Sequence, residues 1–333
     1  MNKKLIIGIV AAVLVVALAI TLVLVLKPDN GDNKTTTTTN PPAPETLKLG
    51  LGVVVSADAS SATADANGKG EADITVAAVL VDKDGKIVKA YIDVMQLALE
   101  YTNAGVAVAN TEFKSKQELG DEYGMKAPWG SAKEWYEHAE IFCNAVVGKT
   151  VADIAGVGSS SELATAGCTI YVGDFVKAVE KAVNNAKASN ATAENVLKIG
   201  MSVEQSTTNA TADAAGSNAA DTTIVAVAMN GETVVAASSD CVQISFGFNT
   251  TGVSSFDATA EIKTKHELGD EYGMKAPWGS AKEWYDHANA FDAACAGKTV
   301  AQIAGLEGNA DLIAAGCTIS IDGFIAAVGN LQD

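Results

Sequence analysis

Residues 118–136 read ELGDEYGMKAPWGSAKEWY, and residues 267–285 repeat this stretch without a single change. The offset of 149 residues (118 to 267) continues downstream, where Gly167-Cys168-Thr169 returns as Gly316-Cys317-Thr318. Such a long interval is unlike the roughly 20–50 residues of a solenoid repeat. The chain therefore contains one unit of domain size that is written twice.

The upstream limit of each unit is marked by a weaker match. Leu47-Lys48-Leu49-Gly50 resembles Leu197-Lys198-Ile199-Gly200 at an offset of 150 residues. We therefore place one module at residues 46–190 and the other at residues 196–333. Units of this length can each bury a core of their own.

Each module is predicted to contain a β-hairpin. Residues 74–81 and 87–94 are rich in apolar side chains and flank Asp84-Gly85, a dipeptide that tolerates the positive φ of a tight turn. Apolar and polar residues alternate along the second of these strands, which indicates one buried face. In the second module the same pattern predicts strands at residues 223–229 and 233–237, around Asn230-Gly231.

A helix is predicted at the end of the repeated block. Ser131 with Glu134 three residues later forms a capping-box pattern, and Ser280 with Glu283 repeats it. Gly148 marks the end of the helix. Residues at helical spacing, which we interpret as core, are Ala132, Trp135, Tyr136, Ala139, Phe142, Cys143 and Val146.

A last helix at about residues 174–186 would place Phe175, Val176, Val179 and Val183 against the core. Antiparallel strands combined with helices predict an α+β fold for each module, an antiparallel sheet packed with helices. Trp135 and its counterpart Trp284 are interpreted as core residues.

The first 26 residues have the composition of a membrane anchor. Met1-Asn2-Lys3-Lys4 is followed by 22 uncharged residues, Leu5 to Leu26. As a helix this segment would be about 33 Å long, enough to cross a hydrocarbon core of about 30 Å. It exceeds the apolar region of a cleaved signal peptide, which is roughly 7–15 residues long. Lysines at its start predict a cytoplasmic N-terminus, so the bulk of the chain is expected outside the cell in a single-pass arrangement.

Residues 27–45 form a Thr/Pro-rich linker that contains four of the six prolines of the chain. This composition predicts an extended spacer between anchor and modules. The whole chain has 333 residues and a formal net charge of −17, which argues against a general nucleic-acid partner.

No catalytic constellation is recognisable in the sequence. His138 and His287 correspond between the modules, and each lies three residues after a core tryptophan, so we interpret both as structural. We find no nucleophilic triad, no metal-ligand cluster and no phosphate-binding glycine loop. We therefore predict no catalytic and no metal-ligating residues.

The five cysteines are Cys143, Cys168, Cys241, Cys295 and Cys317. Only Cys168 and Cys317 correspond, since Cys143 aligns with Asp292 and Cys295 with Val146. A bridge within a module (Cys143 with Cys168, or Cys295 with Cys317) and packing as small apolar residues both remain open, with packing favoured for most of them.

The segment before the last helix gives the strongest indication of chemistry. It reads ELATAGCTI from Glu162 and DLIAAGCTI from Asp311. If residues 318–321 are extended, Thr318 lies on the polar face, opposite Cys317 and Ile319. A preceding glycine allows close approach to the hydroxyl, so this threonine is a candidate for covalent modification.

These motifs resemble the FMN-binding domains of membrane-anchored Gram-positive flavoproteins of extracellular electron transfer, most closely the two-domain PplA-type proteins. The similarity rests on the hairpin, KxELGDEYGMK, GSAKEWYEHA, GKTV and the segment that ends in Thr-Ile, and it covers most of both modules. It implies that a flavin transferase joins FMN through a phosphodiester to Thr169 and Thr318. Gly167 and Gly316 precede these acceptors by two positions.

The segment departs from the family pattern Asp-x-x-Ser/Thr-Gly-Ala-Thr. Cys168 and Cys317 replace the alanine, Ala166 and Ala315 replace the Ser/Thr, and the first acidic residue is Glu162 rather than Asp. Relatives are often lipoproteins, whereas this chain has an apolar anchor. The residues that we expect to border the flavin ring are Asp121, Tyr123, Met125, Trp129, Asp270, Tyr272, Met274 and Trp278.

The resemblance implies an electron carrier rather than an enzyme with its own substrate pocket. A membrane quinol-oxidising protein would donate electrons, and extracellular acceptors such as soluble flavin, ferric iron or a partner reductase would receive them. A covalent link prevents loss of the flavin to the medium. The alternatives are a cofactor-free cell-surface scaffold or adhesive repeat protein, and a non-covalent binder of flavin or another small molecule.

Overall fold

The computed structural model describes residues 44–275 and 279–332, and Pro44–Asp333 forms one compact unit. The predicted anchor and nearly all of the linker lie outside these residues. Among the described residues, no helix has the length and apolarity needed to cross a membrane.

Each module begins with a meander of long antiparallel strands. In the first module these are β1 (Lys48–Ser60), β2 (Gly68–Val81) and β3 (Ile87–Tyr101), and in the second β5 (Val196–Thr208), β6 (Gly216–Asn230) and β7 (Thr233–Phe248). Strand β4 (Lys187–Ala188) pairs with β1, so the sheets have the orders β3-β2-β1-β4 and β5-β6-β7. The predicted hairpin turns lie where expected, with positive φ at Gly85 and Gly231.

Short helices follow the strands in the same order in both modules. The first module has α1 (Lys116–Leu119), η1 (Gly120–Tyr123), α2 (Lys126–Trp129), α3 (Trp135–Val146), α4 (Val151–Val157), α5 (Ser161–Thr165) and α6 (Gly173–Asn184). The second has α7 (Lys265–Leu268), η2 (Gly269–Tyr272), α9 (Trp284–Cys295), α10 (Val300–Ile303), α11 (Ala310–Ala315) and α12 (Asp322–Gly329). The α+β prediction, with helices packed on two antiparallel sheets, is confirmed.

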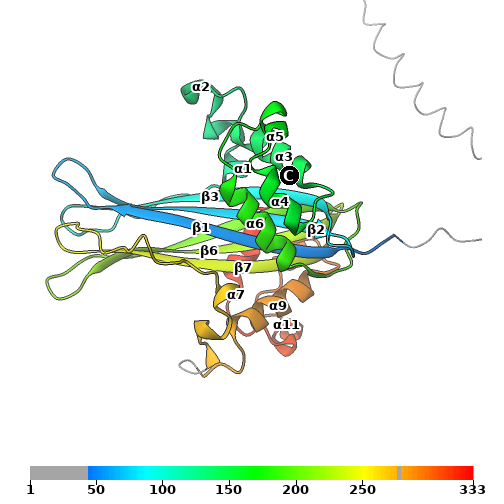
Figure 1. The fold of residues 1–333 in the computed structure, drawn as a ribbon. Coiled ribbons are helices and arrows are strands. Elements are labelled where there is room, and N and C mark those ends of the chain that lie inside the picture. Colours follow the sequence, from blue (N-terminus) through cyan, green and yellow to red (C-terminus); the bar gives the residue numbers. More distant parts are fainter. Residues whose placement is uncertain (1–43, 276–278, 333) are drawn as a thin grey trace, which may run out of the picture. The chain divides into compact units, whose positions relative to one another are not determined.

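The two sheets face each other, and the helices cover their outer faces (Figure 1). One core lies between the sheets and draws on both modules, with Ile74 and Leu80 from β2 packed together with Ile224 from β6 and Phe246 from β7. Two further cores lie between each sheet and its own helices. The modules therefore do not bury their apolar surface separately, since each sheet uses both of its faces.

The contact between the sheets draws on residues of both modules, and one pair of these residues is equivalent. Tyr101, at the end of β3, stacks on Phe248, at the end of β7, with ring centroids 4.4 Å apart. Gly70 leaves room for the ring of Phe246, because a Cβ at Gly70 would lie 2.1 Å from it. Asn218 is fully buried and donates hydrogen bonds to the Glu100 and Val108 carbonyl oxygens of the other module.

The structure corrects the predicted start of the long helix. Helix α3 begins at Trp135, and its N-cap is Glu134, whose carboxylate forms a capping box with Glu137; Glu283 and Asp286 do the same for α9. Ser131 and Ser280 are therefore not caps. Ala132 lies before the helix and is exposed, whereas His138 joins the buried face.

The upstream match at an offset of 150 residues is also corrected. Gly52 pairs with Ala77, and its missing Cβ makes room for the Ala178 carbonyl; Gly200 pairs with Val225 and makes room for Ala327. Gly200 is therefore the counterpart of Gly52 rather than of Gly50, an offset of 148. The strands carry different side chains at most positions, which made the true alignment invisible in the sequence.

Candidate functional site

The two predicted acceptor threonines lie on equivalent loops, residues 166–172 and 316–321, which we name the acceptor loops after this prediction. Helices α5 and α11 end before Gly167 and Gly316, whose φ values of +100° and +104° lie in the region that favours glycine. The next residues, Cys168 and Cys317, are buried in the cores of their modules. Thr169 and Thr318 follow and are exposed, as predicted. Residues 318–321 form no strand, but the predicted alternation of buried and exposed residues holds.

A buried histidine contacts the backbone of each loop. His138 and His287 are only 1% and 2% exposed. The backbone N–H of Thr169 lies 3.4 Å from His138 Nδ1, and that of Thr318 lies 3.2 Å from His287 Nδ1. On the other side of each ring, Nε2 lies 3.3 Å from Ser131 Oγ or 3.4 Å from Ser280 Oγ. Burial lowers the pKa of His138 below its usual value, which favours the neutral ring.

A lysine from the repeated block crosses each acceptor loop. A Cβ added to Gly316 would lie 1.8 Å from Lys282 Nζ, and one added to Gly167 would lie 2.8 Å from Lys133 Cε. Lys282 Nζ donates to the Ala315 carbonyl oxygen at 3.4 Å. The positive φ favours glycine here, and its missing Cβ leaves the space that the lysine side chain occupies. An ammonium group is held within this loop, two residues before the threonine.

A second lysine is buried between two aromatic rings in each module. Lys265 Nζ lies 5.0 Å from the Tyr272 ring centroid and 5.5 Å from that of Trp284. Lys116 lies in the same way between Tyr123 and Trp135. Both tryptophans are buried core residues, as predicted. Cation–π contacts on both sides fix these ammonium groups without neutralising them.

Buried carboxylates position these lysines. Asp93 accepts from the Gln117 backbone N–H at 3.1 Å, and Asp240 accepts from that of His266 at 3.1 Å, so each carboxylate holds the first turn of α1 or α7. Burial raises the pKa of Asp93 to about 7 and that of Asp240 to about 6, against hydrogen bonds that favour the charged form.

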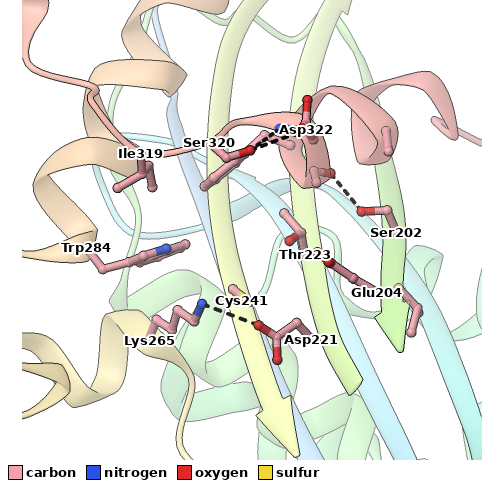
Figure 2. A pocket seen from close by; sticks show the side chains of 14 residues that line it. Ser202, Glu204, Asp221, Thr223, Cys241, Lys265, Trp284, Ile319, Ser320 and Asp322 are labelled. Atoms are coloured by element: carbon pink, nitrogen blue, oxygen red, sulfur yellow. Dashed lines mark hydrogen bonds and ion pairs between the residues drawn. The ribbon is translucent and has the colours of Figure 1, made fainter. Parts of the chain in front are cut away.

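A cavity of about 480 Å³ adjoins the acceptor loop of the second module. It lies on the helix-covered side of the sheet, where strand residues Glu204, Asp221 and Thr223 face the loop residues Ile319 and Ser320 (Figure 2). Lys265 points toward Asp221 across it, with Nζ and Oδ2 4.0 Å apart, and the Trp284 side chain lies on one side. The cavity therefore combines one aromatic wall with carboxylate, hydroxyl and ammonium groups.

Thr318 itself lines a neighbouring cavity of about 310 Å³, and Ile319 and Ser320 line both. The acceptor loop thus lies between two cavities and lines both of them. A group attached to Thr318 has room on either side of the loop.

The predicted ring-bordering residues are only partly brought together. Tyr272 contacts Lys265, which lines the cavity, whereas Asp270 and Met274 are not among its lining residues. Asp270 instead accepts from the Tyr285 hydroxyl at 2.9 Å, and Asp121 accepts from that of Tyr136 at 3.0 Å. Tyr123 and Met125 pack against the core of the first module. Trp278 lies outside the described residues, and the side chain of Trp129 is likewise not described.

Sequence reasoning missed the residues that the structure gathers around the loops. The buried lysines and the strand carboxylates were not among the predicted site residues, the histidines were interpreted as structural, and the serines were interpreted as helix caps. The available signal was recurrence at an offset of 149 residues, which holds for Ser131 and Lys133 within the block and for Lys116 and His138 just outside it. The strand residues carry no such signal, because Glu204 stands where the first module has Ser56.

All five cysteines are free thiols, so the disulfide alternative does not hold in this structure. Burial raises the pKa of every one of them, to about 12 for Cys143 and about 11 for Cys241. They pack as small apolar residues. At the position of Cys143, the second module has Asp292, whose carboxylate accepts from the Ser239 backbone N–H at 3.1 Å.

Comparison with known proteins adds one partial similarity. No protein-family profile and no solved structure matches the chain. A chlorophenol reductase of Desulfitobacterium hafniense is 37% identical over 95 residues, which are 25% of this chain and 29% of that protein. The similarity thus spans less than a third of the length of this curated relative. It does not establish a family.

Proposed function

We propose that this chain is an extracellular, membrane-anchored electron-transfer flavoprotein that carries FMN as a phosphodiester on Thr169 and on Thr318. The observation that carries the proposal is the pair of exposed threonines on equivalent loops, each pinned by a buried cysteine and a buried histidine. A hydroxyl that is exposed to solvent, on a backbone that is held in place, is accessible to a modifying enzyme.

The charges around each loop fit a phosphodiester. Lys282 lies over Gly316 and Lys133 over Gly167, each two residues before the threonine that would carry the negatively charged phosphate. Neither lysine has a carboxylate partner among the ion pairs of the described residues. The cation is therefore available to the phosphate.

The cavity fits the remainder of an FMN group. It offers about 480 Å³, an indole wall from Trp284 and an ammonium from Lys265. FMN would supply the reversible electron transfer, and the protein would supply position and local charge. Its electrons would come from a membrane quinol-oxidising protein and pass to extracellular acceptors such as soluble flavin, ferric iron or a partner reductase. A flavin transferase is the partner that attachment requires.

The proposal is tested by coexpressing the full chain with a flavin transferase, denaturing it and imaging the gel for flavin fluorescence. Thr169→Ala and Thr318→Ala are each expected to remove about half of the signal, because each removes one of two sites. The double variant is expected to be dark. Thr165→Ala is the matched control, since this threonine is exposed at the end of α5 and its hydroxyl donates to the Ser161 carbonyl oxygen. A dark wild-type band would favour a cofactor-free scaffold, and fluorescence lost on denaturation a non-covalent binder.

A further inference from the structure

The Ser–His pairs join the repeated block to the acceptor loops. Ser131 and Ser280 lie in the block before α3 and α9, and their hydroxyls donate to the Lys133 and Lys282 carbonyl oxygens at 2.7 Å. The imidazole of His138 or His287 then spans the distance from this serine to the backbone N–H of the acceptor threonine. The same bridge occurs in both modules.

Only the tautomer with the proton on Nε2 completes the bridge from the serine to the threonine N–H, because the serine hydroxyl already donates its own proton to the lysine carbonyl oxygen. With the proton on Nε2, Nδ1 accepts from the threonine N–H. With the proton on Nδ1, that nitrogen donates to the Gly316 carbonyl oxygen, 2.8 Å away in the second module. In either tautomer Nδ1 is bonded to the Gly-Cys-Thr loop, and Nε2 faces the serine.

We infer that His138 and His287 are positioning residues for flavin attachment, each holding the main chain of its acceptor loop so that the threonine hydroxyl faces the transferase. The inference rests on the proposed function. The buried cysteine fixes the loop one residue before the threonine, and the histidine fixes the threonine backbone itself. Within the part of the chain that the structure describes, neither threonine Oγ has a hydrogen-bond partner. Each threonine hydroxyl is therefore unbonded, whereas the backbone that carries it is held in place.

The reaction that this arrangement serves is a phosphoryl-type transfer from FAD. The bond between threonine Oγ and the FMN phosphorus forms, the pyrophosphate bond of FAD breaks, AMP leaves, and the transferase accepts the hydroxyl proton. The histidine nitrogen contacts the threonine N–H rather than its Oγ, so it acts through the orientation of the backbone. Misplacement of a reacting group by a fraction of an ångström to 1 Å slows such reactions strongly.

The test compares three replacements of His287 in the full chain. His287→Asn keeps an amide near the position of Nδ1 and is expected to retain most of the attachment rate. His287→Gln places its amide near the position of Nε2, and His287→Phe fills the space with no polar atom. Both are expected to lower the initial rate at Thr318 by about tenfold or more. Peptide mass spectrometry after limited exposure to transferase and FAD measures both threonines in the same molecules.

Thr169 is the internal control, because its loop is held by His138 and should label at the wild-type rate in every His287 variant. The reciprocal His138 variants should slow Thr169 and spare Thr318. The inference is overturned if His287→Phe labels Thr318 at the wild-type rate, or if the loss follows only the melting temperature, with Asn no better than Phe. Absence of label from both threonines of the wild type would instead overturn the proposed function.

Discussion

The two modules share their acceptor loops but differ in the charges beside them. In the second module the cavity is lined by Glu204, Asp221 and Asp322, against one ammonium from Lys265. At the equivalent positions the first module has Ser56, Asp73, Gly173 and Lys116. It also has an ion pair, Asp174 with Lys177, where the second module has Gly323 and Ala326. The first site is therefore near neutral, and the second carries a net negative charge.

The two modules also differ in how far each of their segments has diverged, which shows which parts of the duplicated unit were free to change. Strand β1 reads KLGLGVVVSADAS and its counterpart β5 reads VLKIGMSVEQSTT, so the strands have diverged almost completely. The 19 residues from Glu118 to Tyr136 have not changed at all. A duplication old enough to rewrite the strands would also have altered a block with no specific task. The block supplies the serine and the lysine that support each acceptor loop, which is a task of that kind.

The largest expected effect is the loss of stability on removing a side chain from the core that the two modules share. Phe246→Ala should lower the free energy of unfolding by about 3–5 kcal/mol, because the buried ring packs against Phe256 and over Gly70 of the other module. Because the two sheets share this core, the wild type and the variant should each unfold in a single transition. Calorimetry measures this, with the exposed Val106→Ala as control. Two separate transitions in the wild type would show that the modules are independent.

A smaller effect distinguishes the modules by their response to acid. His266 stands where the first module has Gln117, and burial, assisted by the charge of Lys187, lowers its pKa from 6.5 to about 4. Between these values the unfolded chain takes up a proton that the folded chain refuses, so stability falls as the pH is lowered through this window. His266→Gln removes that loss and should gain on the order of 1–3 kcal/mol relative to the wild type at pH 4.

Urea unfolding at pH 7 and at pH 4 provides the measurement. The stability difference between His266→Gln and the wild type should change with pH in the stated direction. The buried acids Asp93, Asp240 and Asp292 titrate in both proteins and cancel in the comparison. A difference independent of pH would contradict the assigned pKa direction.

The smallest expected effect is a difference in flavin midpoint potential between the two sites, and this prediction rests on the proposed function. Reduction adds negative charge to a flavin, so the carboxylates of the second cavity should give FMN on Thr318 a lower midpoint potential than FMN on Thr169. The difference is expected to be of the order of 1 kcal/mol per electron. Potentiometric titration of Thr169→Ala, with FMN on Thr318, and of Thr318→Ala, with FMN on Thr169, measures the two sites separately.

Glu204→Ser gives the second cavity the residue of the first and should raise the potential of its flavin. Glu232→Ser removes an exposed carboxylate that does not line the cavity and is the matched control. Equal potentials at the two sites, or equal shifts in the two variants, would contradict the electrostatic interpretation.

The sequence predicted the duplication, the hairpin turns, the exposure of both threonines and most of the helical core residues, with Ala132 wrongly included and His138 missed. It underestimated the strands, because β2 begins at Gly68 with Gly68, Gly70 and Ala72 facing the other sheet, and small residues give no apolar alternation. The pairing of the sheets could not be predicted, since it depends on surfaces that meet only in the folded chain. Lys116 and Lys265 were missed because a lysine pattern does not reveal the aromatic rings that bury it.

The proposed function depends on FMN bonded to two threonines. The most direct measurement is the intact mass of the protein from its native host, followed by fragmentation to locate each adduct. We predict a chain heavier by two FMN groups less two waters, with one group on Thr169 and one on Thr318. An unmodified mass, or FMN located on any other residue, would contradict it.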